Sequence, residues 1–163
     1  MPTLNKPLLL QQVLAQLEAD LAQAQQAALT AYETATHEEN IAENKYDTLG
    51  LEASYLATGQ ARRAEAIRHC LGTWKQLVLR PFDRLQGIQL GALVWLADEE
   101  DKRQCLFVGP DGAAMKLQQA GHSVQVIGPQ APLGQRLLGC GEGDSIELRI
   151  GGKLQLFEIV QVI

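Results

Sequence analysis

The sequence predicts an α+β protein, in which an N-terminal antiparallel helical hairpin of coiled-coil type precedes a small antiparallel β domain with one short helix. Two observations predict this fold class. Between Pro7 and Thr36 no glycine or proline interrupts the chain, and small or apolar residues recur at alternating spacings of four and three, as in a coiled-coil seam. After Gly87 the pattern changes to short alternating runs separated by glycine-containing turns. The expected divisions are a helical hairpin at 1–80 with an acidic tip at 36–47, a linker at 81–87 and a C-terminal domain at 88–163.

The first helix is expected to start at Asn5, which is a suitable N-cap, with Pro7 in the first turn. A helix of about 30 residues is roughly 45 Å long. Its seam changes from leucine to alanine toward the far end, so the distal half buries less apolar area. The seam residues are Leu10, Leu14, Leu17, Leu21, Ala24, Ala28 and Ala31.

The second helix is expected to start at about Ile41 or Asn44 and to end at Val78, because Pro81 disfavours helical geometry in the residue before it. Three glycines within it each weaken the helix by up to about 1 kcal/mol, which packing must offset. Because the two segments are similar in length and the link is short, an antiparallel hairpin is the natural arrangement. The expected seam is Leu49, Ala53, Leu56, Gln60 or Ala61, Ala64, Ile67, Leu71, Trp74 and Val78.

The C-terminal domain is expected to contain mostly antiparallel strands and one helix. A short helix at Pro132–Leu138 ends at Gly139, and Gly151-Gly152 joins the last two strands in a hairpin. The segment 113–117 is ambiguous. Strands are expected at 88–97, 104–108, 124–127, 145–150 and 154–162.

The segment THEENIAENKYD between the two helices is rich in acids, among them Glu38, Glu39 and Glu43. One interpretation is a solvated helical turn. The other is that the hairpin carries these acids to a metal ion or to a basic partner. Magnesium prefers oxygen ligands, keeps several waters and often uses only one or two protein carboxylates. Two acids on a thin rod can therefore complete the metal site of another protein.

Composition excludes several classes of protein. The net charge of -5 argues against a general nucleic-acid-binding surface, which is basic. The three cysteines lack metal-ligand spacing and indicate reduced thiols in a cytoplasmic protein. No signal sequence, membrane span, GxSxG motif or phosphate-binding loop is recognisable. We therefore expect no enzyme activity, no cofactor of the chain's own and no membrane partner.

Two stretches of the chain resemble the Gre family, the bacterial GreA/GreB transcript-cleavage factors. Asn40-Ile41-Ala42-Glu43-Asn44, followed by Tyr46, resembles the family's tip signature of an aspartate, two variable residues, Glu-Asn and a nearby tyrosine. The second stretch resembles the Ser-Pro-Leu-Gly, Leu-Leu-Gly and Gly-Asp run of the family's C-terminal domain. It consists of Ala131-Pro132-Leu133-Gly134, Leu137-Leu138-Gly139 and Gly143-Asp144.

This resemblance implies a helical hairpin followed by an FK506-binding-protein-like (FKBP-like) domain, and RNA polymerase as the partner. Gre factors dock their C-terminal domain on the rim of the secondary channel of the polymerase, and Pro132, Leu133 and Gly134 lie in the matching run. The hairpin enters the channel, where its tip acids help to bind a second magnesium ion. The polymerase's own active site then cleaves backtracked RNA. Contact with RNA or DNA is expected only through the polymerase complex.

The tip departs from the family pattern at one position. Glu43 matches the tip glutamate, whereas Asn40 stands where the family has its aspartate, and an amide oxygen is a weaker magnesium ligand than a carboxylate. Glu39 or Glu38 is the alternative second acid, with Asn44 and Tyr46 as tip neighbours. If Glu43 and Glu39 hold magnesium, the chain stimulates cleavage; otherwise it competes for the channel. The family's Glu-Ala-Asp motif in the C-terminal domain is replaced by 109–112.

Two other classes of function remain. The C-terminal domain is alternatively an FKBP-like peptidyl-prolyl isomerase or chaperone, with the hairpin as its client-binding arm. Isomerases of that fold line their pocket with aromatic residues, whereas Trp95, Phe107 and Phe157 occupy positions expected in the core. A purely structural coiled-coil dimer is the third possibility. We expect a monomer.

Overall fold

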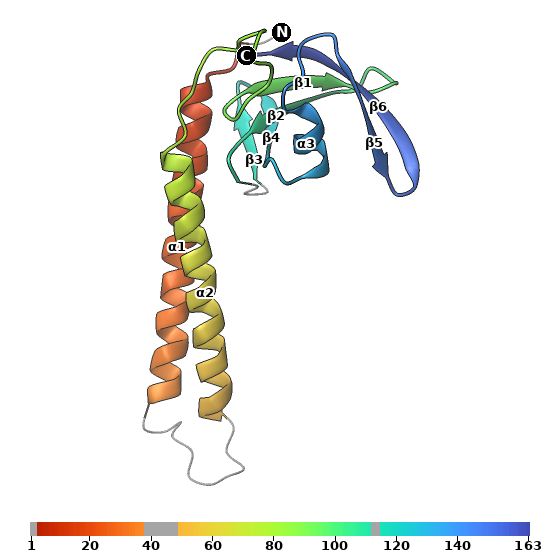
Figure 1. Ribbon diagram of the computed structural model, residues 1–163. Helices are drawn as coiled ribbons and strands as arrows, with labels where there is room; N and C mark the ends of the chain where they lie inside the picture. Colours follow the sequence, from red (N-terminus) through yellow and green to blue (C-terminus); the bar gives the residue numbers. More distant parts are fainter. Residues whose placement is uncertain (1–2, 38–48, 112–114) are drawn as a thin grey trace. The chain divides into compact units, whose positions relative to one another are not determined.

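The computed structural model describes residues 3–37, 49–111 and 115–163 (Figure 1). The chain forms two compact units. We call residues 14–72 the hairpin unit, and residues 1–13 together with 73–163 the sheet unit. The helices and strands are α1 (Lys6–Thr36), α2 (Leu49–Lys75), β1 (Leu93–Ala97), β2 (Arg103–Val108), β3 (Lys116–Gln119), β4 (His122–Ile127), α3 (Pro132–Leu137), β5 (Ser145–Ile150) and β6 (Lys153–Val162).

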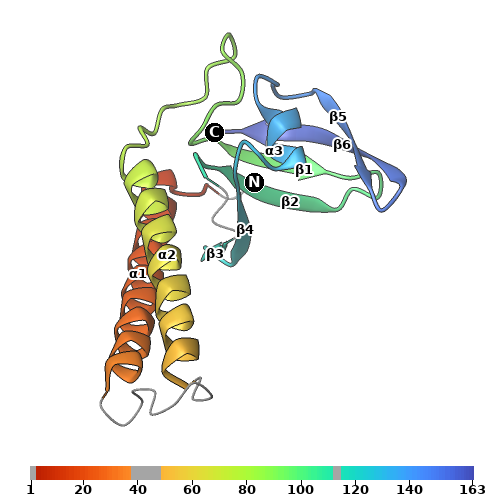
Figure 2. The same ribbon diagram turned by 60° about the horizontal axis from the view of Figure 1, so that its bottom comes forward.

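In the hairpin unit, α1 and α2 lie side by side and run in opposite directions, which confirms the predicted antiparallel hairpin (Figures 1 and 2). The predicted seam of α1 is buried at Leu17, Ala24 and Ala31. On α2, Ala64 and Leu71 are buried. Small residues therefore make up most of the buried seam.

Two predicted seam positions on α2 are corrected, and one open choice between two residues is decided. Leu56 is 57% exposed, and Ala57 is half-buried in its place. A step of four residues after Ala53 fits the helical period as well as the predicted step of three. Of the two alternatives at the next position, Gln60 is half-buried and Ala61 is exposed. Val78 is 62% exposed, because α2 ends before it.

The ends of the helices have local causes. Asn5 caps α1, since its side-chain Oδ1 accepts a hydrogen bond from the backbone N–H of Leu8 at 3.0 Å. At the end of α2 the N–H of Gln76 donates to the carbonyl of Thr73, and Leu77 repeats this three-residue spacing. A tightened last turn of this kind ends the helix at Lys75 rather than at the predicted residue 78.

The sheet unit contains a six-stranded sheet with the order β3-β4-β2-β1-β6-β5. The predicted small sheet with one short helix is confirmed, with one difference: β2 and β4 pair in parallel, whereas every other neighbouring pair is antiparallel. After β2 the chain skips one position in the sheet and forms β3 beyond it. It then returns as β4, which fills the position between β2 and β3. A hairpin that returns in this way runs parallel to β2.

Strand β1 is shorter than predicted. It begins at Leu93, and the expected first half of the strand is a loop in which Gly91 has a φ of 95°. Ile88 pairs instead with the segment after α3: its N–H donates to the carbonyl of Cys140 at 2.8 Å, and its carbonyl accepts from Gly139 at 2.9 Å. The apolar run 88–97 is therefore divided: Ile88 pairs with the segment after α3, and residues 93–97 pair with β2 and β6.

Both faces of the sheet are buried. One face packs against α3 and Ile88 in a core cluster that includes Val94, Leu96, Leu106, Val108, Ile146, Phe157 and Ile159. The opposite face carries Leu93, Trp95, Cys105, Phe107, Val124 and Val126, all buried. On that face Trp74, at the end of α2, meets Phe107 edge-on with ring centroids 5.8 Å apart. None of the helices in the described ranges is long and apolar enough to cross a membrane.

Candidate functional site

The predicted tip site lies outside the described residues. This applies to Glu38, Glu39, Asn40, Glu43, Asn44 and Tyr46. The described helices do define where that segment is attached: α1 ends at Thr36 and α2 begins at Leu49, at neighbouring ends of the hairpin (Figure 1). The convergence of two carboxylates at the tip stays a prediction.

The predicted docking residues begin α3, where each has a different environment. Pro132 is exposed in the first helical turn, where its missing N–H leaves no hydrogen bond unmade. Leu133 is half-buried against the core cluster. Gly134 is buried, and a Cβ added to it would lie 2.1 Å from the carbonyl oxygen of Gly128. Among the three, only Pro132 has an exposed side chain. Leu133 and Gly134 pack against the rest of the sheet unit.

The start of α3 is held by backbone hydrogen bonds to the preceding turn. The N–H of Gln135 donates to the carbonyl of Ala131 at 2.9 Å, and the N–H of Ala131 donates to Gly128 at 3.3 Å. Ala131 has an extended conformation with no side-chain cap. Because alanine has no polar side chain, the helix start depends on backbone hydrogen bonds alone.

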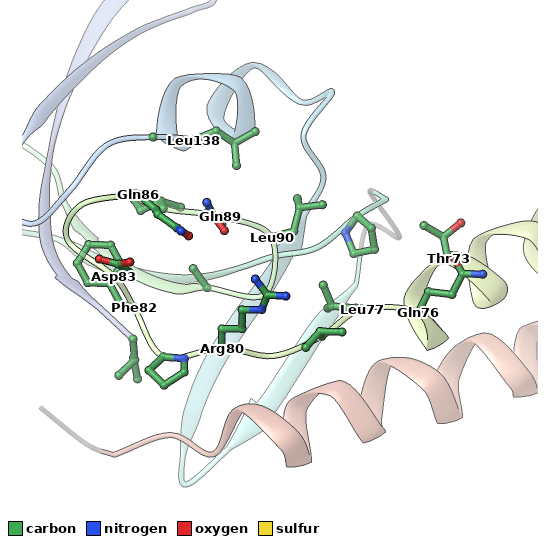
Figure 3. Close-up of a pocket in the computed structure, with 18 residues that line it drawn as sticks. Thr73, Gln76, Leu77, Arg80, Phe82, Asp83, Gln86, Gln89, Leu90 and Leu138 are labelled. Atoms are coloured by element: carbon green, nitrogen blue, oxygen red, sulfur yellow. The ribbon is translucent and has the colours of Figure 1, made fainter.

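A cavity of 790 Å³ lies beside the segment that follows α2 (Figure 3). Its lining combines apolar residues with the polar side chains of Gln76, Arg80, Asp83, Gln86 and Gln89. Phe82 is the single aromatic residue among the lining residues. Sequence reasoning did not find this cavity, because its wall comes from the expected linker and from residues near 138 and 163 that are distant in the chain.

The segment expected to be a linker is a hydrogen-bonded turn. The side chain of Asp83 accepts a hydrogen bond from the N–H of Leu85 at 2.9 Å, and its carbonyl accepts from Gln86 and Gly87. Gly87 has a φ of 76°, and a Cβ there would lie 2.3 Å from the carbonyl oxygen of Gly139. The turn is therefore tied to the end of α3, and it holds Leu85 97% exposed.

Neither of two thiols in the sheet unit has the properties of a nucleophile. Burial raises the pKa of the Cys105 thiol to about 12. The pKa of the Cys140 thiol is also raised, mainly by burial and further by the negative charge of Asp144. A reactive cysteine requires a lowered pKa. Over residues 3–37, 49–111 and 115–163, no group of three or more His, Cys, Asp and Glu residues is arranged to hold a metal ion.

Three aromatic residues of the sheet unit lie in its interior, as predicted. Trp95 is 7% exposed, Phe107 is fully buried and Phe157 is 6% exposed. The 790 Å³ cavity takes only Phe82 from the aromatic residues. This cavity therefore lacks the aromatic lining expected of an FKBP-like isomerase pocket.

Comparison with known proteins gives matches among solved structures only. No protein-family model and no curated protein matches the chain. Thermus aquaticus Gfh1 matches at 23% identity over 91% of this chain and 92% of its own, with a TM-score of 0.41. Thermus thermophilus GreA factor homolog 1 (Gfh1) matches at 21% over 92% and 94%, with a TM-score of 0.39. The GreA/GreB elongation factor of Nitrosomonas europaea matches at 21% over 69% and 91%, with a TM-score of 0.38. At TM-scores this low, these likenesses do not by themselves define a family or a function.

Proposed function

We propose that this chain is a Gre-like transcription elongation factor that binds RNA polymerase through its secondary channel and modulates elongation. The observation that carries the proposal is the run from Ala131 to Gly139, which resembles the Ser-Pro-Leu-Gly and Leu-Leu-Gly run of that family's C-terminal domain, with alanine in place of the serine. Within it Pro132 is exposed at the start of α3, and the buried Gly134 has a steric reason to be glycine. The helical hairpin that precedes this domain supports the same function.

The hairpin has the dimensions for a role inside a channel. Helix α1 has 31 residues and α2 has 27, which correspond to roughly 45 and 40 Å. The acid-rich segment joins their far ends. Under this proposal Glu43, together with Glu39 or Glu38, shares a magnesium ion with the polymerase. The ion would stabilise the attacking and leaving oxygens of the cleaved phosphodiester. The chain would then act through the active site of the polymerase.

Binding is tested with core RNA polymerase and fluorescently labelled chain, by anisotropy. Pro132→Glu should weaken binding by roughly tenfold, because a rim charge without a partner must be desolvated. Pro7→Glu is the matched control, since Pro7 is exposed in the first turn of α1 and the same change should leave the affinity unaltered. No detectable binding of the unaltered chain would overturn the proposal.

The role of the tip is tested separately, in a cleavage assay on backtracked complexes. Replacing Glu39 and Glu43 together by alanine should abolish stimulated cleavage while polymerase binding persists. Glu52→Ala removes an exposed acid from the first turn of α2 and is the control. Asn40→Asp should raise the cleavage rate, because it restores a carboxylate to the tip. If the unaltered chain binds but stimulates no cleavage, it competes for the channel instead.

A further inference from the structure

The two edge strands of the sheet differ in the hydrogen bonds that they receive from the rest of the sheet unit. At the β3 edge, the carbonyl of Gln118 accepts a hydrogen bond from the side chain of Gln12 at 3.2 Å. Gln119 donates to the carbonyl of Asn5 at 3.2 Å. At the opposite edge, β5 lies beside β6 and pairs with it (Figure 2). Within the described ranges no other hydrogen bond involves the backbone of residues 145–150. One edge is therefore covered and the other is free.

The free edge carries exposed apolar side chains. Ile150 on β5 is 48% exposed, and Leu154 and Leu156 on β6 are 57% and 40% exposed. The register places Ile150 and Leu148 on the same sheet face as the buried Ile146. An exposed edge strand with large apolar residues is a template for pairing with another strand, and proteins usually blunt it with charges or prolines.

The sequence of β5 is complementary to itself in the antiparallel direction. Glu147 and Arg149 flank Leu148, so a two-fold axis at Leu148 places each Glu147 opposite an Arg149 of the second copy. The same pairing places Ile146 opposite Ile150. Opposite charges at directly paired positions stabilise a sheet, and like charges destabilise it. Both charged side chains are exposed, and no ion pair of either occurs among the described residues.

We propose that two copies of this chain associate by antiparallel pairing of their β5 strands about a two-fold axis at Leu148. The pairing joins the two sheets into one continuous sheet and covers Ile150 with Ile146 and Leu148 of the second copy. On the other face, two Glu147–Arg149 ion pairs form between the copies, flanked by Leu154 and Leu156. A second copy fits this edge, because the charge pattern of β5 is complementary to itself in the antiparallel direction.

This association is weak, since only one strand of six residues from each copy takes part. It is therefore concentration-dependent, with monomer at low and dimer at high concentration. It departs from the monomer expected from the sequence. It also differs from a coiled-coil dimer, because no residue of the hairpin unit contributes to it.

The test is analytical ultracentrifugation of the full chain over a concentration series that reaches roughly millimolar. The unaltered chain should show a reversible monomer–dimer equilibrium. Glu147→Arg and Arg149→Glu should each weaken self-association at least tenfold, because every ion pair becomes a pair of like charges. The double exchange, Glu147→Arg with Arg149→Glu, should restore it.

A mixture of the two single variants gives the sharpest result. One carries only arginines at the two positions and the other only glutamates, so the mixed pair regains both ion pairs and should dimerise although neither variant does so alone. The charge-matched controls are Glu52→Arg and Arg62→Glu on α2, which should leave the association unaltered. Circular dichroism confirms that each exposed substitution preserves the fold. A monomer at every concentration, or a Glu147→Arg variant that dimerises like the unaltered chain, overturns the proposal.

Discussion

The two units of this chain bury different kinds of side chain. The sheet unit has large residues with no measurable exposure, among them Trp74, Phe107 and Leu93. In the hairpin unit the buried residues are Leu17, Ala24, Ala31, Ala64 and Leu71, and most of these are alanine. Buried apolar area is the main stabilising term in folding, and alanine contributes little of it. The sheet unit therefore depends on packing, and the hairpin unit depends on helix propensity.

The two units can be followed separately in solution. Both tryptophans, Trp74 and Trp95, lie in the sheet unit, so tryptophan fluorescence reports on that unit alone. Far-ultraviolet circular dichroism is dominated by the two long helices. Substitutions in the two units should change stability by different amounts. Glycine-to-alanine substitutions should lower the stability of the sheet unit and raise that of the hairpin unit.

The largest effect is expected from Trp74→Ala. The indole is fully buried and contacts Phe107, so its removal leaves a cavity and should lower the free energy of unfolding by about 3–5 kcal/mol. Urea denaturation followed by circular dichroism measures the loss. Leu85→Ala is the control, since a side chain that is 97% exposed should change stability by less than about 0.5 kcal/mol. A loss below that limit for Trp74→Ala would refute the packing argument.

Alkaline pH should weaken the sheet unit through Cys105. Burial raises the pKa of this thiol from 9.0 to about 12, so the folded state keeps a proton that the unfolded state releases. The neutral Cys105 thiol contributes up to about 4 kcal/mol to the free energy of unfolding. This contribution is complete below pH 9 and is lost as the pH rises toward 12. Urea midpoints measured across that window check the slope. Cys105→Ala should flatten it, and an unchanged slope in the variant would assign the effect to other groups.

Gly109→Ala should destabilise the sheet unit by about 1–3 kcal/mol. A Cβ at this position would lie 2.0 Å from Cη2 of Trp74, and both groups are held by backbone and by packing. The change should appear as a lower thermal midpoint with altered tryptophan fluorescence. Full stability in this variant would mean that the ring of Trp74 can move aside.

Gly59→Ala should have the opposite sign in the hairpin unit. Apart from the chain neighbours and the backbone of α2 itself, no atom lies within 4 Å of the added Cβ, and alanine favours the helix over glycine by up to about 1 kcal/mol. The thermal midpoint of the helical signal should rise. Gly72→Ala is a second test, because its Cβ also meets open space and the same gain is expected. A decrease in both variants would contradict the dependence on helix propensity.

The smallest effect is expected from Gln60→Leu. The side-chain Oε1 of Gln60 is buried without a hydrogen-bond partner among the described residues, which is costly inside a seam. Leucine removes that cost and adds apolar area, so the hairpin should gain up to about 1 kcal/mol. Hydrogen exchange of the α2 amides measures the local gain. Faster exchange in the variant would indicate that the amide has a partner in solution.

Much of the fold was predictable because it depends on neighbours in the chain. The Asn5 cap and the glycine after α3, which has a φ of 84°, follow from local geometry. The Gly151-Gly152 hairpin does so as well. The seam at Leu17 and Ala24 follows from helical period alone. The interior positions of Trp95 and Phe107 follow from the apolar runs that contain them.

Other features depend on contacts between distant segments. The parallel pairing of β2 and β4 was missed because alternation gives each strand's faces but not its neighbours. The start of β1 was placed too early because one apolar run serves two partners, and only the pairing of Ile88 with Cys140 separates them. Leu56 was placed in the seam by its spacing, but the same spacing also allows Ala57, and only the packing of the two helices decides between them.

By itself the sequence determined the two-part architecture, the acid-rich segment between the helices and the motif that begins α3. These properties are local, and residue type and spacing express them directly. Only the tertiary structure shows that position 134 has no room for a side chain, because the carbonyl of Gly128, in the turn before α3, lies against it. It also decided that β5 is an edge strand, which places the Glu-Leu-Arg pattern at the margin of the sheet. Strand order arises from long-range pairing, and no local pattern contains it.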